Sequence, residues 1–162
     1  MKSFQESAAA LNNTIEAVTP LLLQFSDADA AVRPAPGKWS KKEILGHLMD
    51  SACNNHQRFV RAALQGELTF PGYDQERLVE LQRFQDLEWK FLIELWVTYN
   101  RLLVHVIKNL PASAHQVTCR IGPYKPAALG WIAEDYVEHM KHHLNQVCGR
   151  KFESKCAGAA TT

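Results

Sequence analysis

Apolar residues recur at intervals of three and four along four segments of the chain, which is the spacing that places them on one face of an α-helix. The first segment carries a single apolar stripe, formed by Phe4, Ala8, Leu11, Ile15, Val18, Leu22 and Phe25. Pro20 lies inside this stripe and predicts a kink or a break, because proline removes a helical hydrogen bond. No segment alternates between apolar and polar residues for long enough to predict a sheet.

The second helix carries its own start and stop signals. In the stretch WSKKEI, Ser40 and Glu43 have the spacing of a capping box, and Trp39 and Ile44 are placed as the hydrophobic staple across it. A structural role is therefore sufficient to explain these residues. The helix is expected to continue to about residue 65 and to stop at Gly66, since glycine favours the backbone conformation that ends helices.

Two further helices complete the pattern. Asp86 is expected to cap a long helix that Pro111 ends, and Pro126 is expected to open the last helix at its first turn. The stretch QERLVELQRF predicts a short helix before the long one. Four amphipathic helices with one short piece predict an all-α four-helix bundle. We expect residues 1–152 to form this single domain and residues 153–162 to be a flexible tail.

Composition excludes several classes of protein. The 162 residues carry a net charge of +1 and no run of basic residues, which argues against a nucleic-acid-binding surface. The first residues, MKSFQESAAALNN, contain no apolar stretch long enough for a signal peptide or a membrane span. The four cysteines form no CxxC pair, which is typical of reduced thiols. These features predict a cytoplasmic protein.

Histidines are concentrated near the end of the chain, in the stretch HMKHHLNQV. Each helical residue advances about 100° around the axis, so His143 lies about 40° from His139, whereas His142 lies about 60° to the other side. The apolar residues of this segment place His143 on the buried face and His139 at its edge. His142 points outward among Asp135 and Glu138. The segment thus offers the interior an i, i+4 histidine pair, a spacing at which two imidazoles can bind one metal.

This pair alone leaves two interpretations open. Histidines at the edge of a core often pack and donate hydrogen bonds without binding a ligand, and the glutamate of the zincin motif is absent here. A catalytic metal site needs a third protein ligand. The remaining candidates are His47, His56, His105 and His115. His47 shares a polar stripe with Asp50, Ser51, Asn54 and Arg58, which is either a solvated face or the wall of a wet cleft around a ligand.

Two long stretches, PGKWSKKEILGHLMDS and GWIAEDYVEHMKHHLNQV, together resemble the DinB-like family of metal-dependent enzymes, which includes bacillithiol transferases. The middle of the chain, from FPGYDQERLVELQRF to WVTYNRLLVHVIKNLP, is similar as well. The resemblance implies a DinB-like four-helix bundle, commonly a homodimer, with a divalent metal held by His47, His139 and His143. It also implies that His142 does not bind the metal.

The family resemblance leaves the reaction open between two schemes. Three neutral imidazoles leave a metal its full double charge, which favours either a low-molecular-weight thiol bound as thiolate or an activated water. The substrate is therefore expected to be a small molecule, in thiol transfer to an electrophile or in hydrolysis. A non-catalytic metal-binding or small-molecule-binding protein is the alternative. Zinc is the first choice of metal and nickel the second.

Four polar residues are candidates for further roles at such a site. Asp50, one turn from His47, is the candidate base, while Asn54 and Tyr136 are candidates to orient the substrate. Gln146 is placed to hydrogen-bond a histidine ligand. For each of them a polar residue beside a wet cleft is the competing interpretation.

Overall fold

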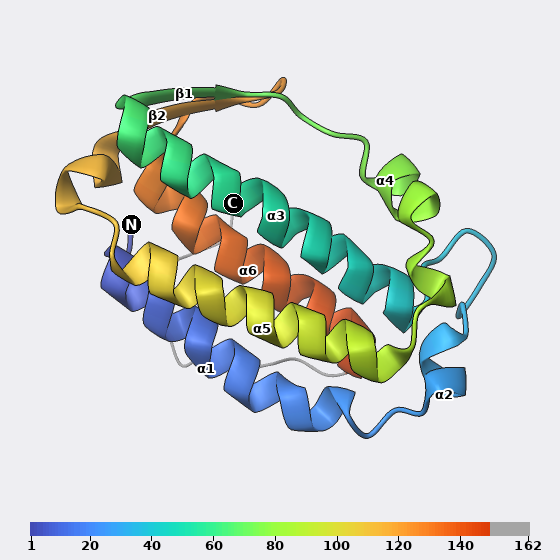
Figure 1. Ribbon diagram of the computed structural model, residues 1–162. Helices are drawn as coiled ribbons and strands as arrows, with labels where there is room; N and C mark the ends of the chain where they lie inside the picture. Colours follow the sequence, from blue (N-terminus) through green and yellow to red (C-terminus); the bar gives the residue numbers. More distant parts are fainter. Residues whose placement is uncertain (150–162) are drawn as a thin grey trace.

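The computed structural model describes residues 1–149, in which four long helices lie side by side as a bundle (Figure 1). They are α1 (Phe4–Leu22), α3 (Lys41–Gln65), α5 (Trp89–Lys108) and α6 (Leu129–Cys148). The connections contain the helices α2 (Asp27–Ala31) and α4 (Gln75–Gln82) and the short 3₁₀ helices η1 (Phe84–Asp86) and η2 (Ala112–Gln116). The all-α bundle predicted from apolar spacing is confirmed. The predicted tail, residues 153–162, lies outside the described residues.

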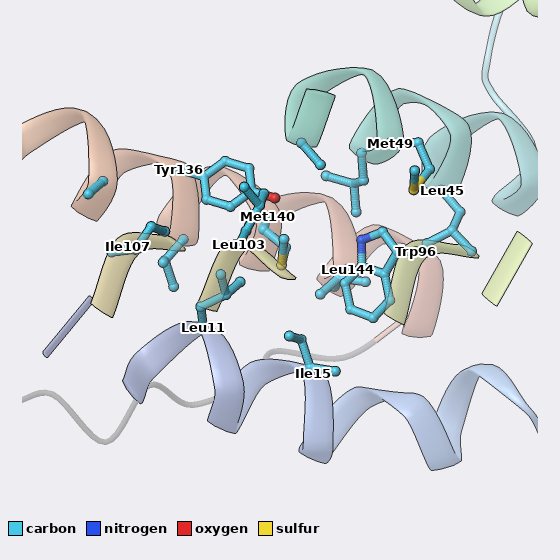
Figure 2. Close-up of a cluster of buried hydrophobic side chains, with 14 of the residues drawn as sticks. Leu11, Ile15, Leu45, Met49, Trp96, Leu103, Ile107, Tyr136, Met140 and Leu144 are labelled. Atoms are coloured by element: carbon cyan, nitrogen blue, oxygen red, sulfur yellow. The ribbon is translucent and has the colours of Figure 1, made fainter. Parts of the chain in front are cut away.

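The order of the helices in the bundle differs from their order in the sequence. Both α5 and α6 pack against α1, and both also pack against α3, so α1 and α3 occupy opposite corners. Apolar side chains from all four helices meet between them (Figure 2), among them Leu11 and Ile15 of α1, Leu45 and Met49 of α3, Trp96 and Leu103 of α5, and Met140 and Leu144 of α6. This arrangement puts α3, which carries His47, beside α6, which carries His139 and His143.

The predicted signals at the ends of α3 are present. The Ser40 hydroxyl accepts a hydrogen bond from the Glu43 backbone N–H at 3.2 Å, and the Glu43 carboxylate accepts one from the Ser40 N–H at 2.8 Å. Gly66 adopts φ 77°, the left-handed conformation that ends the helix. Because both ends are set locally, the position of His47 in the second turn is determined by nearby sequence.

The start of α5 lies three residues beyond the predicted cap. Asp86 belongs to η1 and forms an ion pair with Arg83, and α5 begins at Trp89. The carboxylate of Asp27 accepts a hydrogen bond from the Trp89 N–H at 2.8 Å, so a residue of α2 satisfies this helix end. Pro20 lies in the last turn of α1 and does not break the helix, which continues to Leu22. Its missing N–H removes one hydrogen bond, but only two helical residues follow it.

A small sheet closes one end of the bundle, and the apolar pattern did not predict it. Strand β1 (Glu67–Phe70) pairs in parallel with β2 (Thr118–Ile121), and β2 pairs with the two-residue β3 (Ala127–Ala128) in antiparallel fashion. Because β3 follows Pro126, α6 begins at Leu129 and the prediction that this proline opens the helix is wrong. The β1 and β2 strands each bury a single residue, which leaves no alternation long enough to recognise.

Across residues 1–149, each helix is either too short or too polar to cross a bilayer.

A tight contact between α3 and η1 leads to a test of the packing. A Cβ added to Gly46 would lie 2.2 Å from ring atoms of Phe84 and 2.8 Å from its Cβ, so neighbouring backbone must shift. Gly46→Ala should therefore lower the free energy of unfolding by about 1–3 kcal/mol, although alanine favours helices. Chemical denaturation measures this loss.

Gly66→Ala is the matched control, because nothing lies within 4 Å of the added Cβ there and only the positive φ opposes it. It should cost about 1 kcal/mol. A Gly46→Ala variant as stable as the parent protein would contradict the described contact with Phe84.

Candidate metal centre

Three histidines from two helices converge on one point between α3 and α6. His47 comes from α3, and His139 and His143 come from consecutive turns of α6. Their ring nitrogens include one set that lies within 4.8 Å of one another, and the Nε2 atoms of His47 and His139 are 3.3 Å apart. In the part of the chain that the structure describes, this is the one group of three or more side chains with such a donor arrangement. His56, His105, His115 and His142 lie outside it.

The local geometry explains why these three rings meet. His143 follows His139 by four positions, so both rings project from one side of α6, with ring centroids 4.6 Å apart. The ring of His47 approaches them from α3 at 5.2 Å and 4.8 Å. His142 is exposed, as its angle on the helical wheel predicted. The inward i, i+4 pair is therefore present, and His47 completes it.

Burial keeps these imidazoles neutral. The pKa of His47 is lowered to about 3 and that of His139 to about 4, chiefly because burial disfavours the charged ring and secondly because the other histidines lie close. The pKa of His143 is lowered for the same main reason, although its hydrogen bond to Gln146 opposes the shift. At neutral pH all three rings are thus uncharged and each keeps one nitrogen lone pair.

Gln146 orients His143, as its position three residues further along α6 predicted. The Oε1 atom of Gln146 accepts a hydrogen bond from Nδ1 of His143 at 3.1 Å. Nε2 of His143 therefore carries the lone pair. The amide nitrogen of Gln146 donates to Nε2 of His142 at 3.1 Å, so His142 supports the same amide from the solvent side. Gln146 sets the tautomer of one ring of the cluster.

His47 is held by packing. Its ring lies against that of Trp39, with centroids 5.2 Å apart, and only 1% of the residue is exposed. Its Nδ1 is buried and makes no hydrogen bond to any described residue. The Nε2 atom, in contrast, faces His139. Trp39 thus contributes to the site, a role that its placement as a helix staple did not predict.

Asp50 lies one turn after His47 and is also buried. One carboxylate oxygen accepts a hydrogen bond from the Gln82 amide at 2.6 Å, while the other is buried and has no hydrogen-bond partner within residues 1–149. Burial raises the pKa of Asp50, against the lowering effect of the Gln82 bond. The carboxyl group is therefore a better proton acceptor than an exposed aspartate.

The two other predicted site residues already have protein partners. The Asn54 side chain donates to the backbone carbonyl of Asp50 at 2.9 Å. The Tyr136 hydroxyl donates to Oδ1 of Asn100 at 2.5 Å inside the core, and burial raises the pKa of Tyr136 well above its usual value. Neither contact tests a role in orienting substrate, which stays a prediction. Tyr136, however, lines a cavity that His139 also lines.

A cavity of about 810 Å³ begins beside His139 and extends between α3, α6 and the sheet. Its walls include Ser51, Asn55 and Arg58 of α3, Tyr73 and Tyr124 of loops, and Trp131 of α6. The polar stripe of α3 thus lines a cleft at Ser51 and Arg58, one of the two interpretations left open by the sequence. Tyr73, Tyr124 and Trp131 were not predicted as cavity residues, because no recognisable spacing in the sequence relates them to the histidines.

The fold is shared with a solved protein. The structure superposes on YfiT from Bacillus subtilis with a TM-score of 0.80 at 16% sequence identity, covering 90% of this chain and 84% of that one. YfiT is described as "a probable metal-dependent hydrolase with an unusual four-helix bundle topology".

Sequence comparison identifies the family. A protein of Oceanobacillus iheyensis, named "Putative metal-dependent hydrolase", is 25% identical over 132 residues, which cover 77% of this chain and 76% of that protein. The sequence profile of the DinB superfamily matches residues 9–147. Because this match spans most of the chain, the protein belongs to the DinB superfamily.

Proposed function

We propose that His47, His139 and His143 bind one divalent metal ion. The spacing of two of the proposed ligands fits such an ion, and all three ligand atoms lie within 4.8 Å of one another. Two nitrogens bound tetrahedrally to zinc at about 2.0–2.1 Å stand about 3.3–3.4 Å apart, and the Nε2 atoms of His47 and His139 are separated by 3.3 Å. Without an ion, two neutral imidazoles at this distance can form only one hydrogen bond, from the N–H of one ring to the lone pair of the other. The three lowered pKa values further support ligation, because only a neutral imidazole can bind a metal.

Zinc is the proposed metal, with nickel second. Imidazole nitrogen suits zinc, copper, iron and nickel, so the ligand set alone leaves a choice. Zinc accepts a four-coordinate site with three protein ligands and an open position. The three-histidine set matches that requirement, and the cavity beside His139 provides room for a substrate.

We further propose that the protein is an enzyme that hydrolyses a small molecule in this cavity. A divalent ion at the histidine cluster would supply a Lewis acid and an activated water. The observation that carries the proposal is an open cluster of three neutral histidines at the edge of a large cavity. A site that only stabilises the fold is usually closed by four protein ligands. The names of the two relatives agree with this reading.

Asp50 is the proposed proton acceptor. It lies on the same face of α3 as His47, its free carboxylate oxygen has no partner among the described side chains, and its raised pKa suits a base. The transfer of a thiol to an electrophile remains the second candidate, because three neutral ligands also favour a bound thiolate. That reaction needs no protein base, so the dependence on Asp50 separates the two.

Homodimerisation and a cytoplasmic location stay predictions. Partly exposed apolar side chains at Phe91, Leu95 and Leu102 of α5 support an interface between two copies.

Metal stoichiometry tests the ligand assignment. His47→Ala, His139→Ala and His143→Ala should each reduce bound zinc sharply after stripping and reloading with one equivalent. His142→Ala is the matched control and should retain nearly full occupancy, since its ring lies outside the cluster. Elemental analysis of protein without a histidine tag measures this. Loss of zinc in His142→Ala with retention in His139→Ala would contradict the assignment.

Proton release on metal binding tests the state of the rings. At pH 5.5, three histidines with an ordinary pKa of about 6.5 would together release roughly 2–3 protons when they bind zinc. Since the pKa values of His47 and His139 are about 3 and about 4, those two rings are already neutral at that pH. We expect release of about one proton or less. Titration calorimetry in buffers of different ionisation enthalpy counts the protons, and a count above two would refute the buried neutral cluster.

Replacing the proposed base tests the reaction. Asp50→Asn should lower kcat on a panel of esters and amides by about 10²–10⁴-fold and leave zinc occupancy unchanged. It should also remove the decline in rate that acidification causes as Asp50 takes up a proton. Asp86→Asn, at a surface carboxylate paired with Arg83, serves as control. Hydrolysis that is insensitive to Asp50→Asn, or turnover only with a thiol cosubstrate, would favour thiol transfer instead.

A further inference from the structure

Arg58 lies in the same cavity as His139 but three helical turns away from the histidine cluster. It follows His47 by 11 residues on α3, which brings it back to nearly the same face of the helix, about 16 Å further along the axis. Ser51 and Asn55 lie between the two positions and also line the cavity. The wall formed by α3 therefore carries a guanidinium and two small polar groups, and α6 contributes His139 of the histidine cluster to the same cavity.

The charge of Arg58 is not balanced by the protein. Its Nη1 donates a long hydrogen bond of 3.3 Å to the side-chain Oδ1 of Asn55, and its guanidinium lies 5.5 Å from the ring centroid of Phe70. Its Nε is buried without a hydrogen-bond partner among residues 1–149. None of the carboxylates in that range comes within the 4 Å of an ion pair with it.

Several other polar side chains share the cavity wall with Arg58. The side chains that act electrostatically on Arg58 are Tyr73, Cys119 and Tyr124, and none of them is a carboxylate. Lys125 adds a second cation to the cavity wall, and Asp135 is the one carboxylate on that wall. A partly buried cation without a counter-charge is costly to the folded protein. Proteins accept such a cost mainly at functional sites, where a ligand can supply the missing counter-charge.

We propose that Arg58 binds the anionic end of the substrate, a carboxylate or a phosphate, while the other end of the same molecule reaches the histidine cluster. The same cavity is also lined by Tyr73, Tyr124, Trp131 and Ile132, whose rings and aliphatic groups suit an apolar body. The substrate class is then an elongated small molecule with an apolar centre and one oxyanion terminus. The proposal gives the substrate class of the proposed function. It depends on that function only for the end of the molecule that reacts at the histidine cluster.

The spacing sets the length of that molecule. Helical side chains lean toward the N-terminus of their helix, so the guanidinium reaches back from its Cα toward His47. This leaves roughly 10 Å between the guanidinium and the cluster. A phenyl ring with a four-carbon acid chain approaches this length.

The test compares three probes of one shape: 4-phenylbutyrate, its uncharged amide and 4-phenylbutyl phosphate. Binding is followed by ligand-observed NMR on the full-length protein, with and without one equivalent of zinc. The wild-type protein should bind at least one of the two anions at least about tenfold more tightly than the amide, with or without zinc. Whichever anion is preferred identifies the oxyanion. Equal affinity for the acid, the phosphate and the amide would overturn the proposal.

Variants assign the preference to Arg58. Arg58→Gln should abolish the preference for the anion and leave the affinity for the amide unchanged, whereas Arg58→Lys should retain part of it. Lys125→Gln, at the exposed cation of the same wall, is the matched control and should keep the preference. Loss of the preference in Lys125→Gln but not in Arg58→Gln would contradict the assignment.

Thermal stability excludes a merely structural role. Because its charge is uncompensated, Arg58→Gln should melt at or above the temperature of the wild-type protein. A variant that melts lower and binds acid and amide equally poorly would show a structural residue and overturn the proposal. If zinc does not bind but the preference for the anion persists, the metal assignment fails while the oxyanion site stands. If zinc binds but the preference for the anion is absent, the metal assignment stands and only the oxyanion site is contradicted.

Discussion

Three uncharged, at least partly buried imidazoles lie together where α3 packs against α6. The rest of the site depends on this packing of the two helices. His47 from α3 meets His139 and His143 from α6, with no acidic group joining the cluster within residues 1–149. Burial and mutual proximity oppose protonation of the rings. Each ring therefore stays neutral and keeps one nitrogen lone pair. A bundle that packs these helices together therefore maintains a ligand set suited to a cation.

The same contact creates the cavity. The sheet joins the end of α3 to the start of α6, because β1 follows α3, β3 precedes α6, and β2 pairs with both. The two helices thus run in opposite directions (Figure 1). Sheet residues and His139 both line the cavity between them. Arg58 near the sheet and the histidine cluster form two fixed points in one space. Under the proposed function, substrate selection at Arg58 and chemistry at the histidine cluster would take place at different points of that space.

Signals confined to a few residues were readable from the sequence. The capping box at Ser40, the stop at Gly66 and the inward pair His139 and His143 each depend on one helix and its periodicity. His47 was different, because its stripe is polar and periodicity alone did not distinguish a cleft from a solvated face. The family resemblance selected it.

Features that depend on distant segments were not predictable in this way. Asp27 satisfies the start of α5 from a separate helix, and this moved the helix start beyond Asp86. The β1 and β2 strands pair across about fifty residues, so neither is stable or recognisable alone. The contact of Trp39 with His47 and the cavity wall at Trp131 likewise arise only when the helices pack.

X-ray absorption at the zinc K edge tests the central claim most directly, because it reports the atoms around the ion. For protein reloaded with one equivalent of zinc, we expect three imidazole rings with nitrogens at about 2.0–2.1 Å and one further light atom. His142→Ala should give the same spectrum. Sulfur neighbours at about 2.3 Å, or fewer than two imidazoles, would place the ion at cysteines or on the surface and contradict the three-histidine centre.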